Sequence, residues 1–165
     1  MVRVKVKRNT SGGIDYLEKA CNYVKNDEKL IYIYGHGVDP YHTGYAYEQM
    51  LAVRRYYGKI SGNPLIHFII SFEGDVEDKL TAWNHGHRIA SYFDGTYQTI
   101  WCIHQKKRGF SRFHMHIIVN SVSYTTGKMF VSGVEEMKRF QEHIERVTMM
   151  SSWFYFADAD TSDDA

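Results

Sequence analysis

Cysteine, long apolar runs and internal repeats are scarce or missing in this chain, and each absence excludes a class of protein. The two cysteines, Cys21 and Cys102, are far apart, which excludes a CxxC motif or a disulfide framework and predicts buried thiols. No uncharged apolar run is long enough to cross a membrane, and the basic N-terminus lacks a signal-peptide pattern. We therefore expect a soluble, cytoplasmic protein with no membrane partner.

Linkers are also missing from the 165-residue sequence, so we expect a single domain, which spans residues 1–150. The net charge of +1 conceals an asymmetry, because residues 157–165 carry four aspartates and no basic residue. Without these four charges the body of the chain has a net charge near +5, since 1 + 4 = 5. Residues 151–165 are accordingly expected to form a disordered acidic tail.

Basic residues are gathered in three places, at residues 3–8, at residues 54–59 and at residues 106–112. Clustered lysine and arginine suit a polyanionic partner such as nucleic acid. The chain is also rich in aromatic residues, with 13 tyrosines and 9 phenylalanines. Tyrosine and arginine together suit the stacking and phosphate contacts by which proteins bind single-stranded nucleic acid.

The hydrophobic pattern alternates between helical and strand periods along the chain. Helical spacing predicts helices over residues 14–25, 43–57, 75–93 and 133–150, the first of them capped near Ser11. Strand patterns cover residues 2–7, 30–34, 65–72, 97–104, 114–120 and 128–131, and the first of them reads as an edge strand. This order predicts an α+β fold, with helices packed on an antiparallel-rich central sheet in a ferredoxin-like arrangement.

Three histidines are predicted to meet at one end of a hairpin. His104 ends one apolar run, and His114 and His116 begin the next. Side chains two apart on a strand share a face, so three imidazoles converge there and can hold a divalent cation. The competing interpretation is that these are polar residues on a solvated sheet face. If strand 65–72 runs parallel to strand 97–104, Ser71 lies beside the histidines.

Several segments resemble one family when taken together. They are HFIISF (67–72), the histidine at 104, HMHIIVNSV (114–122), TGK (126–128), ACNYVKNDEK (20–29) and AYEQMLAVRRYYGK (46–59). This combination resembles the conjugative relaxases, the mobilisation nucleases of plasmids and integrative elements within the HUH endonuclease superfamily. The resemblance runs from about residue 10 to residue 148 and implies the relaxase version of the fold.

The resemblance also implies a role for individual residues. Tyr23 matches the catalytic tyrosine, and His104, His114 and His116 match the three metal-binding histidines. Ser71 falls in the second motif, which family members use to contact DNA, and His67 and Asn120 support the motifs. The basic clusters, rather than the resemblance, add Arg54, Arg55, Lys106, Lys107, Arg108 and Arg112 to the DNA-binding set, with a solvated loop as the competing interpretation of residues 106–112. Family members commonly have an acidic residue two positions after the first histidine, where this chain has Lys106.

The implied reaction is a metal-dependent nick in one DNA strand, with Mn or Mg as the ion. A tyrosine oxygen attacks a phosphodiester, remains on the 5′ phosphate and leaves a free 3′ hydroxyl, so the reverse reaction can rejoin the strand. The implied partners are single-stranded or extruded DNA at a transfer origin and accessory relaxosome proteins.

Other interpretations remain open at this point. Tyr16 shares a helical face with Tyr23 and competes as the nucleophile. The chain as a whole can be a non-catalytic nucleic-acid-binding module derived from a relaxase. An HUH replication initiator usually places its tyrosine after the HxH motif, and a two-histidine RNA phosphodiesterase needs two HxT/S motifs that this sequence lacks.

Overall fold

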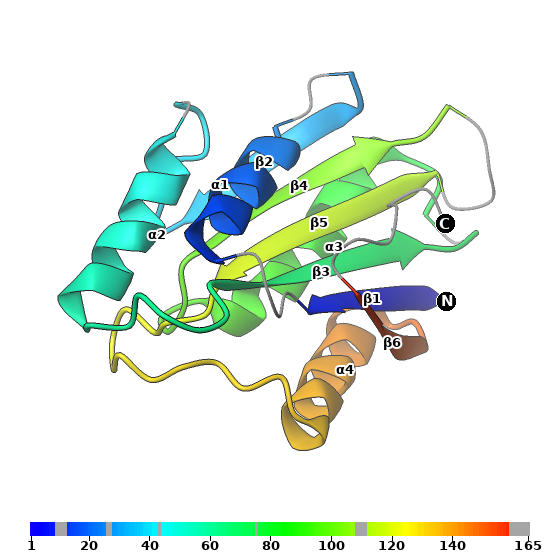
Figure 1. Ribbon diagram of the computed structural model, residues 1–165. Helices are drawn as coiled ribbons and strands as arrows, with labels where there is room; N and C mark the ends of the chain where they lie inside the picture. The colour runs from blue at the N-terminus through cyan, green and yellow to red at the C-terminus, as the bar shows by residue number, and fades with distance from the viewer. Residues whose placement is uncertain (9–12, 26–27, 43, 75, 108–111, 159–165) are drawn as a thin grey trace.

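A six-stranded sheet with strand order β2-β4-β5-β3-β1-β6 runs through the computed structural model (Figure 1). The structure describes residues 1–8, 13–25, 28–42, 44–74, 76–107 and 112–158. The strands are β1 (Val2–Arg8), β2 (Leu30–His36), β3 (Leu65–Phe72), β4 (Thr99–Gln105), β5 (Phe113–Asn120) and β6 (Ser152–Asp158). The helices are α1 (Gly13–Tyr23), α2 (Tyr45–Tyr56), α3 (Lys79–Ala90), α4 (Val134–Thr148) and the short 3₁₀ helix η1 (Ser91–Phe93).

The strand directions confirm the predicted α+β fold. All neighbouring strands pair antiparallel except β1 and β6, which are parallel. Strand β5 lies between β3 and β4 and is antiparallel to both, so β3 and β4 run in the same direction and end at the same edge of the sheet. This is the arrangement that the sequence predicts for strands 65–72 and 97–104.

Helices cover both faces of the sheet, but they do so unequally. Helix α3 lies behind the sheet as drawn and α4 packs on the same face, whereas α1 lies in front of the sheet with α2 beside it at the left (Figure 1). The rear core includes Val4, Met115 and Phe140, and the front core joins Leu17 of α1 and Met50 of α2 to Ile118 of β5. Since side chains alternate along a strand, His114 and His116 share the front face with Ile118.

The predicted edge position of β1 is wrong, because β6 pairs along its outer side from Val2↔Ser152 to Arg8↔Asp158. Residues 152–158, which the sequence predicts to belong to the acidic tail, form this strand, and residues 159–165 lie outside the described residues. The run Trp153-Phe154-Tyr155-Phe156 is rich in residues that favour strands. Its alternate member Phe154 packs on Phe140 of α4, with 5.9 Å between the ring centroids, and this burial fixes the strand.

The remaining differences concern the ends of elements. The helix expected from residue 75 begins at Lys79, because the side chain of Asp78 caps it by accepting a hydrogen bond from the Thr81 amide. The strand expected over residues 128–131 is reduced to one isolated bridge between Val122 and Met129. The cap expected near Ser11 falls outside the described residues. No helix in the described part of the chain is long and apolar enough to cross a membrane.

Candidate active site

Strand register brings the predicted histidines together on the front face. His104 of β4 lies directly opposite His114 of β5, and His116 lies one side-chain step further along β5, opposite Cys102. The ring centroids of His104 and His116 are 4.8 Å apart. All three residues are at most 5% exposed, because α1 covers this part of the sheet. The hairpin prediction for these residues is therefore reproduced by the structure.

Each of the three rings is held by a neighbour through one nitrogen. Nδ1 of His114 lies 3.0 Å from Oγ of Ser71, and Nε2 of His104 lies 3.2 Å from Sγ of Cys102. Nδ1 of His116 lies 3.1 Å from Nε2 of His67 on β3. Hydrogen bonds of this kind fix the orientation and tautomer of an imidazole.

Tyr23 lies over this histidine cluster. It is the last residue of α1, and its ring centroid is 5.2 Å from that of His116 and 6.0 Å from that of His104. Helix α1 is anchored by the buried residues Leu17, Ala20 and Cys21, and this anchoring directs its C-terminal end toward the histidines. Tyr16 precedes Tyr23 by seven residues, about 10 Å along the helix axis.

Burial and neighbouring charges keep His116 neutral. The pKa of His116 is held well below its usual range, first by burial and then by the proximity of His67, His104, His114 and Lys7. A neutral imidazole is the form that binds a metal ion. Among the described residues, however, no group of three His, Cys, Asp or Glu side chains stands arranged to hold an ion. The donor type fits a divalent metal, whereas the rings are turned toward their protein partners.

The family is decided by a match to the model of the relaxase MobA/VirD2-like nuclease domain, which covers residues 16–153. This chain belongs to the MobA/VirD2-like relaxases. No curated protein matches it significantly. Membership supports relaxase-type DNA nicking as its general function, with single-stranded DNA as the general class of partner.

Arg54 has a structural role in this relaxase, which corrects its assignment to the DNA-binding set. Its side chain is fully buried, so it is not available to a ligand on the surface. The guanidinium donates to Oγ of Ser121 at 2.6 Å and to the carbonyl oxygens of Ile60, Ser61 and Pro64. These bonds tie α2 to the loop before β3 and to the end of β5.

We expect Arg54→Ala to destabilise the fold by roughly 3 kcal/mol, because it leaves several buried acceptors without a charged donor. Urea denaturation measures this loss. The neighbouring Arg55 is exposed and provides the matched control, since Arg55→Ala is expected to change stability by less than roughly 0.5 kcal/mol. Equal stability of the two variants would contradict the structural role of Arg54.

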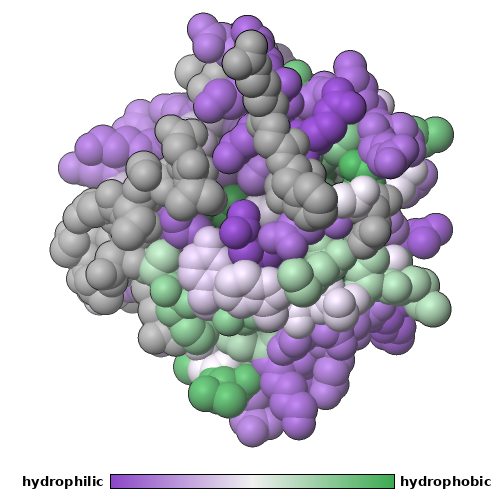
Figure 2. Space-filling view, turned by 90° about the vertical axis from the view of Figure 1, so that its right-hand side faces the viewer, coloured by the Kyte–Doolittle hydropathy of each residue, from purple (hydrophilic) through white to green (hydrophobic). Residues whose placement is uncertain are grey.

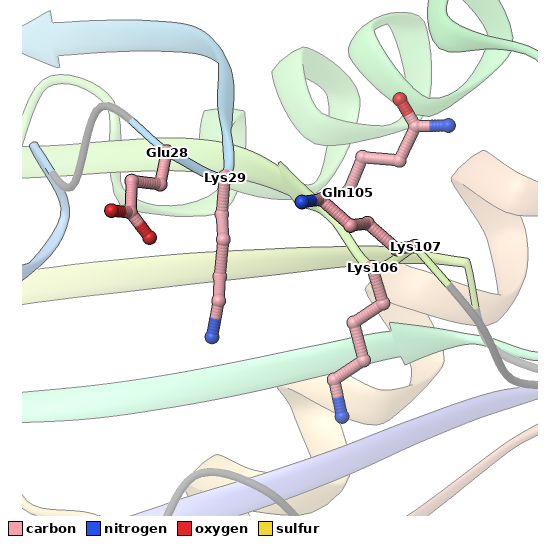
Figure 3. Close-up of a pocket in the computed structure, with 5 residues that line it drawn as sticks. All are labelled: Glu28, Lys29, Gln105, Lys106 and Lys107. Carbon is pink, nitrogen blue, oxygen red and sulfur yellow. The ribbon is translucent and has the colours of Figure 1, made fainter.

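A basic pocket opens where β4 ends, one residue beyond His104. It has a volume of about 610 Å³ and is lined by Glu28, Lys29, Gln105, Lys106 and Lys107. Lys29 and Lys106 extend in a similar direction, whereas Gln105 points away from them (Figure 3). An adjoining pocket of about 390 Å³ adds Lys79 and Arg112. Figure 2 looks onto this side of the relaxase and shows hydrophilic residues over its upper part.

The other site residues have mixed outcomes. Arg108 lies outside the described residues, and DNA contacts of Ser71 and Arg55 stay predictions. Asn120 is buried and holds the backbone, donating to the Met50 carbonyl at 3.1 Å and to Oε1 of Gln98. Sequence reasoning missed the bond from His67 to His116 and the contribution of Lys29 to the basic pocket. The spacing of four between His67 and Ser71 places both on the front face and is the signal that points to His67.

Proposed function

We propose that this relaxase nicks and rejoins one strand of DNA at a transfer origin, with Tyr23 as the nucleophile. The observation that carries the proposal is the position of the Tyr23 ring over His104 and His116. Helix α1, which contributes Tyr23, is far from these histidines in the sequence. A tyrosine brought to buried imidazoles beside a basic pocket combines a nucleophile, metal-binding groups and a site for a polyanion.

The reaction is a transesterification that conserves the phosphodiester energy. The phenolic oxygen of Tyr23 bonds to phosphorus as the bond to the 3′ oxygen breaks. The phenolic proton leaves to a base, and the 3′ oxygen is released as a hydroxyl. A phenol is mostly protonated at neutral pH because its pKa is near 10, so this step needs activation. The product is a 5′-phosphotyrosine, and attack by the 3′ hydroxyl reverses the reaction.

His104, His114 and His116 would hold a divalent ion, Mn²⁺ or Mg²⁺, which would polarise the scissile phosphate. Ser71, Cys102 and His67 orient these rings through their second nitrogens. Lys106 stands where family members commonly have an acidic residue, and His104 contacts Cys102 through Nε2.

Lys106, Lys107 and Arg112 would bind DNA phosphates beside the histidines, because they line the pockets that begin one residue after His104. Arg55 and Arg108 complete the proposed set. The biological setting would be mobilisation of a plasmid or integrative element, with accessory relaxosome proteins as further partners.

Capture of the covalent adduct tests the proposal. The protein is mixed with labelled single-stranded DNA carrying the transfer origin of its element, with Mn²⁺, and run on a denaturing gel. A protease-sensitive shifted band that disappears with EDTA is expected. DNA binding without any adduct would instead assign the chain to the non-catalytic binding modules.

A further inference from the structure

The front face of the sheet continues beyond the helices that cover the histidines. Side chains of β1 and β6 with the same orientation extend it past β3, because Arg3 pairs with both Ser71 and Trp153. Lys5 pairs in the same way with Ile69 and Tyr155. Helix α1 lies in front of the sheet with α2 beside it, and both leave β1 and β6 to one side (Figure 1).

Two cross-strand rows therefore connect the histidines to an aromatic pair at the far edge. The first row contains His104, His114, Ser71, Arg3 and Trp153. The second row contains Cys102, His116, Ile69, Lys5 and Tyr155. Three strand spacings separate β5 from β6, a distance of about 14 Å.

The aromatic pair has the geometry of a stacking surface. The ring centroids of Trp153 and Tyr155 are 5.2 Å apart, and the ring planes are inclined by 29°. Trp153 is 42% exposed although tryptophan is usually largely buried, and Phe154 between them turns to the opposite face against α4. Packing of Phe154 on the rear face thus anchors β6, and the alternation of side chains along the strand places both rings on the front face.

Positive charge lies between the rings and the histidines. Arg3 is the accessible cation there, with a 28% exposed side chain that forms an ion pair with Glu73 at 3.6 Å, whereas Lys5 and Lys7 are only 6% exposed. Stacked aromatic rings beside a basic strip are how proteins bind single-stranded nucleic acid without reading its sequence.

We infer that Trp153 and Tyr155 form a base-stacking platform for single-stranded DNA a few nucleotides from the scissile phosphate. This inference rests on the proposed function for its substrate and adds a second contact region on β6. The bases stack on the two rings, and the backbone passes Arg3, which pairs with Trp153 across the two strands. The platform holds the strand in place while Tyr23 acts on it.

Fluorescence anisotropy with labelled oligo(dT) in EDTA tests the platform independently of nicking. We expect Trp153→Ala to raise the dissociation constant about tenfold, the cost of losing one base-aromatic stack, without changing the salt dependence. Lys106→Ala provides the contrast, since losing a phosphate contact lowers the salt slope by about 0.7. Trp153→Phe keeps an aromatic face and is expected to retain most of the affinity. Tyr56→Ala, at an 82% exposed tyrosine on α2, is the matched control.

Quenching of tryptophan fluorescence supplies a direct readout of contact. Of the three tryptophans, Trp101 is buried, Trp83 is partly buried against Tyr32 and His87, and Trp153 is 42% exposed, so oligo(dT) should quench Trp153 and this part of the quenching should vanish in Trp153→Phe. Unchanged binding by Trp153→Ala with a wild-type adduct would overturn the platform and leave the nicking function standing. Trp153-dependent binding without an adduct would support the platform and overturn the nicking function. A change of oligomeric state with unchanged DNA binding would overturn the platform and assign β6 to contacts between copies of the chain.

Discussion

Tyr23→Phe is expected to abolish the covalent protein–DNA adduct while leaving DNA binding within about twofold of wild type. The substitution removes only the phenolic oxygen, the atom that would bond to phosphorus. The ring that packs 5.2 Å from His116 stays in place, so the fold and the neighbouring imidazoles are unaffected. A denaturing gel with labelled transfer-origin DNA and Mn²⁺ measures the adduct, and anisotropy on the same DNA measures binding.

Tyr16→Phe is the matched control for this experiment. Both tyrosines belong to α1, but Tyr16 lies two turns closer to the start of the helix, about 10 Å away along its axis. Its variant should form the adduct at the wild-type rate. If the adduct survives Tyr23→Phe and is lost in Tyr16→Phe, the nucleophile is Tyr16. Loss of the adduct in both variants together with loss of DNA binding would show that the substitutions damage the fold.

The meeting of the histidines could be predicted from the sequence because two simple rules decide it. A hairpin aligns the end of β4 with the start of β5, and a period of two puts His114 and His116 on one face. The parallel direction of β3 and β4, which places Ser71 beside His114, follows from the same hairpin and the crossover that precedes it. These are local rules that depend on residues close together in the chain.

Long-range packing accounts for the features that sequence reasoning missed. Residues 151–165 end in a stretch with four aspartates, which suggests a disordered tail, but Phe154 packs against Phe140 of α4 and its strand pairs with β1. Arg54 appears in a basic helix segment typical of a DNA contact. Its acceptors come from the loop before β3 and from Ser121, 67 residues away, and no local pattern reveals them.

Loss of a histidine from the cluster is expected to have the largest effect on metal binding. Calorimetric titration with Mn²⁺, in the absence of DNA, should show affinity falling by at least about a hundredfold in His116→Ala and His114→Ala. Each substitution removes a neutral imidazole that would bind the ion directly. The resulting loss of Mn²⁺ affinity should exceed the 10- to 100-fold loss that follows removal of a residue that only orients a ligand. His67→Ala, which removes the partner of His116 Nδ1, should fall in that smaller range. His36→Ala is the control, because His36 is engaged by Tyr124 outside the cluster.

The effect of His104→Ala shows whether His104 binds the metal ion although Lys106 follows it in the loop after β4. Its Nε2 contacts Cys102, and the residue two positions later is Lys106 rather than the acidic residue that family members commonly have. If His104→Ala weakens Mn²⁺ binding as strongly as His116→Ala, all three imidazoles bind the ion and the thiol contact orients the first of them. If His104→Ala binds Mn²⁺ like wild type, the ion is held by His114 and His116 with the phosphate, and metal affinity should then rise when DNA is added. Wild-type affinity in all three histidine variants would refute the metal centre itself, because the front face of the described sheet brings no other imidazole except His67 to this position.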